Sequence, residues 1–483
     1  MRRFGIALAA MLLPSAAPAA PAPPPLPPAL PPALPDRFAN APAGQSAAPL
    51  ADGWWRSFGD PVLDRMVETA LAGNLDIAVA AARLEQAAAG VKAAKGAMLP
   101  GVNLGGSAAV QQLSVEDVQG RAFSRFPGFQ RTVEQFGLNG AASWELDLFG
   151  RLSAGARAAR AEAGAAGAGL AGARLTVAAE VASTYIAARG LEARLAVARA
   201  RVAALEETDR LLRLRAASGI AALTETDRSG AELAGAASAI PALETALEAV
   251  RNRLDVLMGR APGQAAGDMA GSGGIPVVRG PAVPDGPSSL LARRPDVVAA
   301  EQLVAASDAR VAAAIAARYP RLTISGLAGF LANGLGNLLT GGAVQAGASA
   351  GVSAPLFAGG RLRAQQDGAE AQLREAVAGW RQTVLRAAAE SEDALIALGK
   401  RSEQAEALGT VLARLGDSRV RIESAVLAGA ASRVDALAVE RQRLDAEDQA
   451  MAARAEAARA GVAAFRALGG GWQAGADRLA VSH

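Results

Sequence analysis

Hydrophobic residues recur at helical spacing along most of the chain. Within 191–212 the spacing alternates between four and three residues, as in the seam of a coiled coil, and Asp209 is the one polar residue in that seam. A second seam runs through 240–257. Long helices are predicted over 150–217 and 361–427, where proline is absent, and another helix is predicted over 288–318.

Two stretches, about 102–147 and 322–354, depart from this helical period. In both, small or polar residues alternate weakly with apolar ones, as in the strands of membrane barrels. Each stretch is predicted to be a β-hairpin between two helices. Pro100 and Pro320 stand where helix changes to strand, because proline lacks a backbone donor and disfavours helix at the residue before it.

This helix–hairpin–helix pattern occurs twice at nearly constant offsets. The segments 74–100 and 294–320 align at an offset of 220 residues. Gly150 and Gly360 lie 210 residues apart, and each stands where strand changes back to helix. Glycine suits that position because it reaches the backbone angles that a sharp change of element needs. Two tandem copies of a unit of roughly 200 residues are therefore predicted.

The first residues resemble an export signal. Arg2 and Arg3 precede an apolar run at 4–13, and small residues at 17–19 supply a cleavage site. No later run of about eighteen uncharged apolar residues exists, so no transmembrane helix is expected in the mature chain. The predicted division is a signal peptide at 1–19, a Pro/Ala-rich lead at 20–53, a first repeat at 54–258, a linker at 259–287, a second repeat at 288–468 and a loose tail at 469–483. Within the lead, the proline-rich part at 21–35 is expected to be extended and poorly ordered.

Composition narrows the function. Aromatic residues make up 4% of the chain, too few for several thick cores, whereas alanine and leucine at helical spacing suit thin, closely packed helices. Acids and bases interleave, with 49 Lys+Arg and 46 Asp+Glu, so no nucleic-acid partner is expected. The chain has no cysteine, no phosphate-binding loop and a single histidine, so neither a cofactor nor an enzyme is predicted. Glu145 and Asp147 are assigned to a polar lumen or a junction rather than to catalysis.

Segment lengths point to an assembly. A helix of about 68 residues extends roughly 100 Å, and strands of about 10–13 residues suit a tilted crossing of a bilayer core roughly 30 Å thick. A sheet in lipid must have no open edge, and four strands cannot close around a lumen. Three chains would supply twelve strands.

Several motifs together resemble one family. They are WWRSFGDP at 54–61, WELDLFGR at 144–151, PLFAGGR at 355–361 and the two helix–proline–strand junctions. Over residues 54–468 the chain is similar to the TolC/OprM-type outer-membrane factors of Gram-negative bacteria, in the NodT-like branch. The alternative that the residues leave open is a structural coiled-coil protein of the cell envelope, although such a protein has no use for paired amphipathic strands.

The resemblance implies a fold, a location and partners. The expected fold is an α+β membrane protein: a homotrimer with a twelve-stranded outer-membrane β-barrel, four strands per chain, continued by a long periplasmic α-helical barrel. The expected function is the passive exit duct of a tripartite efflux or secretion system, with a periplasmic adaptor, an inner-membrane RND-type or related transporter, and outer-membrane lipid as partners. Relatives often carry a lipid-modified cysteine, and none is present here, so no lipid anchor on cysteine is expected.

Two turns are candidate contacts for the adaptor. Gly219 and Gly429 lie 210 residues apart at the ends of the long helices, where the resemblance places adaptor-contacting turns. A plain helical hairpin turn is the other interpretation, and both can hold together.

A periplasmic gate is the last expectation. Glu225 and Asp435 each lie six residues beyond a turn glycine, so a trimer would hold two rings of three acids that need cationic partners. The nearest candidates in sequence are Arg228, Arg433 and Arg441. The resemblance implies that such acid–arginine links close the duct, although Ala438 replaces a second acid that relatives often have. Alternatively, the two acids only favour the helix dipole.

Overall fold

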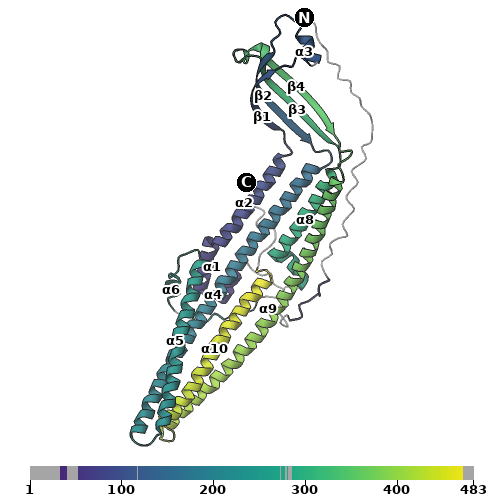
Figure 1. Cartoon of the computed structure of the whole chain (residues 1–483). Coiled ribbons are helices and arrows are strands. Elements are labelled where there is room, and N and C mark those ends of the chain that lie inside the picture. Colours follow the sequence, from purple (N-terminus) through teal and green to yellow (C-terminus); the bar gives the residue numbers. More distant parts are fainter. Residues whose placement is uncertain are drawn as a thin grey trace. The chain divides into compact units, whose positions relative to one another are not determined.

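The computed structural model describes residues 33–40, 53–116, 118–271, 273–277, 280 and 286–470. They form two compact units, and several helices pass from one unit into the other (Figure 1). The sheet unit contains Gly90–Arg160 and Ala305–Arg374. The helical unit contains the described residues of Pro31–Ala89, Ala161–Val304 and Glu375–His483. The predicted signal peptide, most of the predicted lead and nearly all of the predicted tail lie outside the described residues.

The sheet unit contains the four predicted strands. They are β1 (Gly101–Gln112), β2 (Thr132–Leu146), β3 (Arg321–Ala332) and β4 (Val344–Ser353). All neighbours pair antiparallel in the order β1-β2-β3-β4, so the two hairpins lie side by side through β2 and β3. The predicted hairpin positions are thus confirmed to within a few residues.

The hairpin connections are more ordered than the sequence predicts. The expected loop at 115–130 contains the short helix α3 (Val118–Phe123). The connection of the second hairpin contains two single 3-10 turns, η3 (Leu335–Asn337) and η4 (Gly341–Ala343). These turns are short enough that no strand or helix period marks them in the sequence.

The long helices agree closely with the sequence pattern. The described helices of at least thirteen residues are α1 (Pro61–Gly73), α2 (Leu75–Gly96), α4 (Arg151–Ala217), α5 (Leu223–Leu257), α8 (Pro295–Ala316), α9 (Arg361–Leu427) and α10 (Arg433–Ala467). Besides α3, η3 and η4, the shorter ones are η1 (Trp54–Phe58), α6 (Ala265–Asp268), η2 (Pro287–Ser289) and α7 (Leu290–Arg293). The predicted proline-free helices are α4 and α9.

One predicted helix was wrong as a single element. The sequence favours a continuous helix from Ser288 to Arg318, but the structure has η2, α7 and α8 in that span. Arg294 adopts an extended conformation with ψ 121° because Pro295 follows it and disfavours helix there. Pro295 then begins α8, where its missing backbone donor does no harm.

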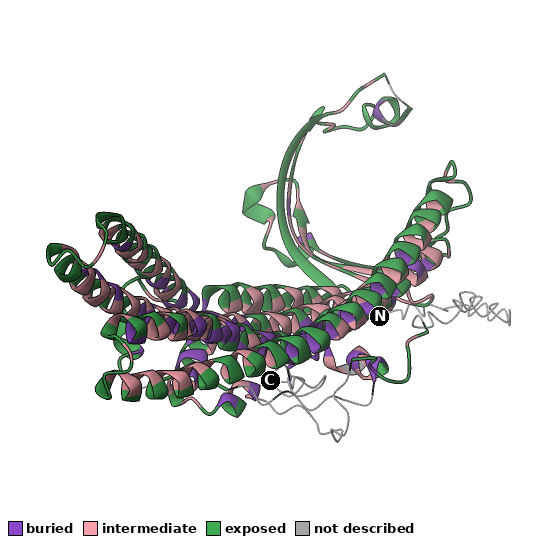
Figure 2. Ribbon diagram, turned by 90° about the horizontal axis from the view of Figure 1, so that it is seen from below, coloured by how far each residue is buried: buried purple, intermediate pink, exposed green. Residues whose placement is uncertain are grey.

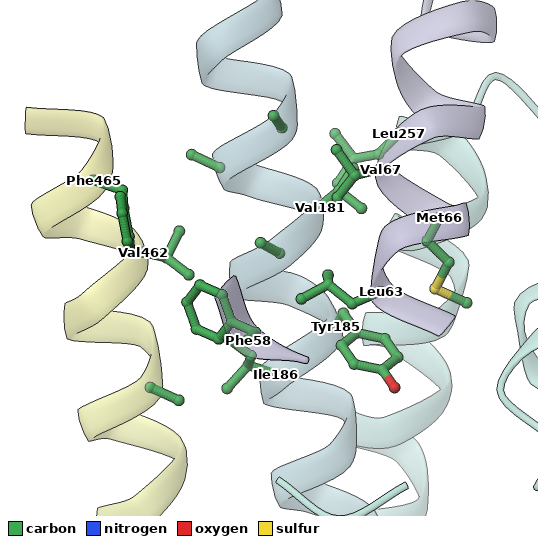
Figure 3. Packing of buried hydrophobic residues seen from close by; sticks show 14 of the residues in the cluster. Phe58, Leu63, Met66, Val67, Val181, Tyr185, Ile186, Leu257, Val462 and Phe465 are labelled. Carbon is green, nitrogen blue, oxygen red and sulfur yellow. The ribbon is translucent and has the colours of Figure 1, made fainter. Parts of the chain in front are cut away.

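The core of the helical unit lies around the middle of α4. Figure 3 shows Tyr185 of α4 beside Leu63 of α1, whereas Ile186 lies beside Phe58 on the side of Val462 and Phe465 of α10. The first aromatic of the WWRSF segment completes this core, because Trp54 stacks on Phe465 with ring centroids 5.1 Å apart. Buried residues gather along these middle portions, whereas the strands are mostly exposed (Figure 2).

Part of the predicted Pro/Ala-rich lead packs against the helical unit. Phe38 is 5% exposed and belongs to the core of the helical unit. The Glu392 carboxylate of α9 accepts hydrogen bonds from the backbone amides of Ala39 and Asn40, at 2.7 and 3.1 Å. The Asn40 side-chain amide donates a third bond to the same carboxylate at 2.8 Å. A buried aromatic ring therefore anchors this segment, which follows the proline-rich part at 21–35 that is expected to be poorly ordered.

Helix α5 is long and apolar enough, by length and composition, to cross a membrane. Only 6% of its most apolar stretch is buried within the chain. The sequence prediction considered only runs without any charged residue. A stretch with at most two charged residues can still be apolar enough to cross a membrane, and α5 contains such a stretch. Ion pairs join α5 to α4, among them Arg199–Glu244 at 2.7 Å, so α5 packs as a helix of the bundle with an uncovered apolar surface.

Candidate functional site

The two faces of the sheet differ in chemistry. Antiparallel pairs always join residues of equal parity, as in Leu104↔Gly140 and Ser143↔Ser325, so odd-numbered residues share one face and even-numbered residues the other. The exposed large apolar side chains of the even face are Val102, Leu104, Val110, Ile324, Val344 and Val352. The odd face carries mainly small and polar side chains, and its large apolar residues are Val133, Leu327 and Leu331. This alternation is the one that a strand with lipid on one side and water on the other requires.

Two amide side chains of the odd face are joined by a hydrogen bond that crosses β3. Gln345 of β4 donates a hydrogen bond of 2.8 Å to Asn139 of β2, although β3 lies between these strands. The residue between them is Gly329, which pairs with both Asn139 and Gln345. A Cβ at Gly329 would collide with the Leu138 carbonyl and the Asn139 side chain. Glycine is therefore required for this bridge.

The polar side chains of the first strand-to-helix junction bind one another and nearby backbone groups. Trp144 donates from Nε1 to the Met98 carbonyl at 2.9 Å. Arg151, the first residue of α4, pairs with both carboxylate oxygens of Glu145, at 2.9 and 2.8 Å. The Phe149 ring stacks on Tyr319 with centroids 5.0 Å apart, which ties this junction to the helix–strand switch of the second copy.

Asp147 caps the start of α4. Its two oxygens accept the backbone amides of Leu152 and Ser153, at 2.9 and 2.7 Å. Partial burial acts to raise the pKa of the Asp147 carboxyl, but the hydrogen bonds from Leu152 and Ser153 outweigh it, and the pKa lies below its ordinary value. Glu145 and Asp147 are thus junction residues, as the sequence indicates.

The second junction lacks such a network. Leu356 and Phe357 are 97% and 92% exposed, although both are large and apolar. Gly359 and Gly360 have φ of +57° and +81°, and Gly150 in the first junction has +77°. The predicted junction glycines Gly150 and Gly360 therefore adopt the left-handed backbone that other residues disfavour. Pro100 and Pro320 stand directly before β1 and β3, as predicted.

The two helix turns share a backbone and differ in their caps. Gly219 and Gly429 have φ of +74° and +75°. The backbone amide of the residue after each glycine donates a hydrogen bond across the turn. Ile220 donates to the Arg215 carbonyl and Ala430 to the Ala425 carbonyl, both at 2.8 Å. Beyond the first turn, Ala222 occupies the N-cap of α5 and offers no side-chain acceptor.

Asp435 completes a capping box at the second turn. Ser432 is the N-cap of α10, and its hydroxyl accepts the Asp435 amide. The Asp435 carboxylate accepts the Ser432 hydroxyl and amide, at 2.7 and 2.9 Å. These bonds, the hydroxyl first, hold the pKa of Asp435 below its ordinary value. The predicted acid is therefore engaged by its own helix start.

The other gate candidates take different places. Glu225 lies exposed in the first turn of α5, and Arg228 and Arg433 are exposed. Arg441 does not meet either predicted acid: it forms an ion pair of 2.8 Å with Glu232, which joins α10 to α5. Sequence reasoning missed Glu232 because nothing in a local pattern pairs residues 209 positions apart.

Further ion pairs, also absent from the sequence prediction, attach α10 to α4. Arg194–Asp448 and Arg201–Asp445 span these two helices, at 2.8 and 2.9 Å. Together with Arg441–Glu232 they follow one face of α10 towards its first residues. The only sequence signal for them is the mixture of acids and arginines in 440–448.

These features define a class of protein: a membrane protein whose sheet has one apolar and one polar face, with long paired helices attached to both hairpins. Comparison with known proteins identifies the family. The profile described as "Outer membrane efflux protein" matches residues 66–260 and 286–470. The chain belongs to the outer membrane efflux protein family, whose members are outer-membrane channels and not enzymes.

Similar proteins and solved structures support this family assignment. The "Pyoverdine export outer membrane protein OpmQ" of Pseudomonas aeruginosa is 31% identical over 91% of this chain and 91% of its own length. "Nodulation protein T" of Rhizobium leguminosarum bv. trifolii is 28% identical, over 83% of this chain and 84% of its own. Among solved structures, the outer-membrane channel OprN has a TM-score of 0.80 at 30% identity, covering 92% of this chain and 98% of that one. The chain is thus an efflux channel of the outer membrane that extends into the periplasm.

Proposed function

We propose that the chain is one third of a twelve-stranded duct. The observation that carries this proposal is the four-stranded sheet itself, which has an apolar face, a polar face and an unpaired strand at each edge. An open edge is not viable in lipid, and three sheets of four strands close around a lumen. The uncovered apolar surface of α5 supports the same assembly, because the helices of neighbouring chains would cover it.

The duct carries small molecules out of the cell for an energised inner-membrane transporter, through a periplasmic adaptor. Relatives are named for pyoverdine export and for antibiotic efflux, and neither name decides the solute for this chain. The two-repeat division, with the signal peptide at 1–19 and the linker at 259–287, is part of this proposal. The alternative, a structural coiled-coil protein of the envelope, does not account for a sheet with one apolar and one polar face.

The assembly is testable on purified protein. Native mass spectrometry of the detergent-solubilised mature chain should show a trimer, and planar bilayers should show channels. A stable monomer in lipid would contradict the shared barrel. Orientation follows from single cysteines in this cysteine-free chain: an impermeant maleimide on intact cells should label Thr340→Cys and leave Ala430→Cys unlabelled. The reverse pattern would invert the orientation.

We further propose that the ends near Gly219 and Gly429 contact the adaptor and hold the gate. The support is that α5 and α10 are linked there by the Arg441–Glu232 ion pair, which joins the two copies within a chain. Exposed ion pairs contribute only about 0–1 kcal/mol each, so this link needs others to act with it. Asp435, Glu225, Arg228 and Arg433 remain the candidates for links between chains.

Single-channel conductance separates these roles. Glu232→Gln should raise conductance because it releases α10 from α5. Glu244→Gln is the matched control, since the Arg199–Glu244 pair joins helices of the same copy. Asp435→Ala should raise conductance if its charge closes the duct between chains. Unchanged conductance in Asp435→Ala with normal trimer yield would leave it the helix-capping role alone.

A further inference from the structure

The sheet ends in two unpaired strands. In the described residues β1 pairs only with β2, and β4 pairs only with β3. Each outer edge therefore presents free backbone donors and acceptors along ten or more residues. The inference below rests on the proposed trimer and goes beyond it, because it concerns which residues meet at the seam between chains.

The two hairpins have the same internal register. Gly101 pairs with Ser143 in the first hairpin, and Arg321 pairs with Ser353 in the second. The second pair follows from the first by adding 220 residues to the leading strand and 210 to the returning strand. The two offsets that align the sequence therefore also align the strands in space.

The contact between the hairpins serves as a template for the seam. Within the chain, β2 meets β3 with Ser143 opposite Ser325 and Leu146 opposite Leu322. In a ring of six similar hairpins, β4 takes the place of β2, and β1 of the next chain takes the place of β3. Adding 210 to the β2 residue and subtracting 220 from the β3 residue converts each observed pair into a pair at the seam. Ser143↔Ser325 thus becomes Ser353 opposite Gly105, and Leu146↔Leu322 becomes Leu356 opposite Val102.

The exposure of these residues supports that seam. Leu146 and Leu322, which face each other in the template, are half-buried. Their counterparts Leu356 and Val102 are 97% and 74% exposed in the single chain. The shifted pairs also join residues of equal parity, so the apolar face and the polar face continue without interruption from one chain to the next.

We propose that β4 of one chain pairs with β1 of the next in the register that sets Ser353 opposite Gly105, and that Leu356 then covers Val102 on the apolar face. The edge strands of this chain are thus complementary to each other in one register. A shift by one residue would turn every apolar side chain of β4 to the lumen.

Disulfide trapping tests the register directly, because the natural chain has no cysteine. The double variant Ser353→Cys with Gly105→Cys should give a reducible covalent trimer under mild oxidation. A side chain at Gly105 has room, since the nearest atom to its Cβ is the Asn139 carbonyl oxygen at 4.0 Å. Ser143→Cys with Ser325→Cys is the matched pair within one chain, and it should form a disulfide without joining chains.

Ser353→Cys with Ser107→Cys is the register control. Residues displaced by two positions have Cα atoms roughly 7–8 Å apart, beyond ordinary disulfide reach. A covalent trimer from this control pair, or none from the test pair while the matched pair oxidises, would overturn the register and leave the duct intact. Native mass and conductance, measured on the same samples, report separately on the trimer itself.

Discussion

The two strand-to-helix junctions follow one plan but satisfy their side chains differently. In the first, Glu145 pairs with Arg151, Asp147 caps α4 and Phe149 stacks on Tyr319. In the second, Leu356 and Phe357 are almost fully exposed. A duplicated unit in a closed ring has one neighbour in its own chain and one in another. The first junction meets its neighbour within the chain, whereas in the proposed trimer the second would meet its neighbour only on assembly.

The two helix turns reverse this order. The second turn caps its returning helix with Ser432 and Asp435, whereas the first has Ala222 at the equivalent place. Ile220 and Leu223 beside it are 68% and 75% exposed. The first copy therefore has a paired junction and an uncapped turn, whereas the second has a capped turn and an exposed junction.

The largest expected effect comes from Gly329, because only glycine fits there although the corresponding residue of the first hairpin is an alanine. Gly329 corresponds to Ala109 of the first hairpin, 220 residues earlier. Gly329→Ala should destabilise the assembled protein by about 1–3 kcal/mol because the added methyl meets the Leu138 carbonyl and the Asn139 side chain. Thermal dissociation of the trimer in detergent measures the effect. Gly326→Ala on the inner strand β3, where an added Cβ has nothing within 4 Å, is the control. Equal losses in both variants would show a general intolerance of the sheet to side chains.

Loss of the first junction's cap comes next. Asp147→Ala should cost about 1 kcal/mol because two amides at the start of α4 lose their acceptor. Asp147→Asn should retain most of this stability, since asparagine also caps helices. Chemical denaturation followed by circular dichroism gives the comparison. Equal stability of all three proteins would contradict the capping role.

The same carboxylate should make stability depend on pH. Its pKa is lower in the folded than in the unfolded state, so its contribution is present above the unfolded pKa of about 3.9 and is lost as the pH falls through the folded pKa. The stability difference between the natural chain and Asp147→Asn should stay constant from neutral pH to about pH 5 and shift against the natural chain below about pH 4. A difference independent of pH down to the acid transition would refute this.

The smallest effects concern the two turns. Ser432→Ala should weaken the start of α10 by about 1 kcal/mol, and Ala222→Ser should stabilise the start of α5 by about 0.5–1 kcal/mol. Hydrogen exchange of the amides in the first turn of each helix reports these local changes. If Ala222→Ser instead slows adaptor binding without altering exchange, the bare turn matters for docking rather than for stability.

The sequence by itself determined the number of strands, the two long helices and the two faces of the sheet. These follow from local rules, since helical and strand periods, prolines and glycines act within a few residues of where they stand. The same locality placed Gly150, Gly360, Gly219 and Gly429 at their sharp turns.

The tertiary structure decided which charges meet. Arg441 pairs with Glu232 across 209 residues, Asp435 turns back to Ser432, and Glu392 binds the amides of Ala39 and Asn40. The sequence offers several acids within reach of each arginine, and their pairing depends on how helices pack side by side. The break before α8 shows the converse case: Pro295 is a local signal that was present in the sequence and outweighs the helical pattern around it.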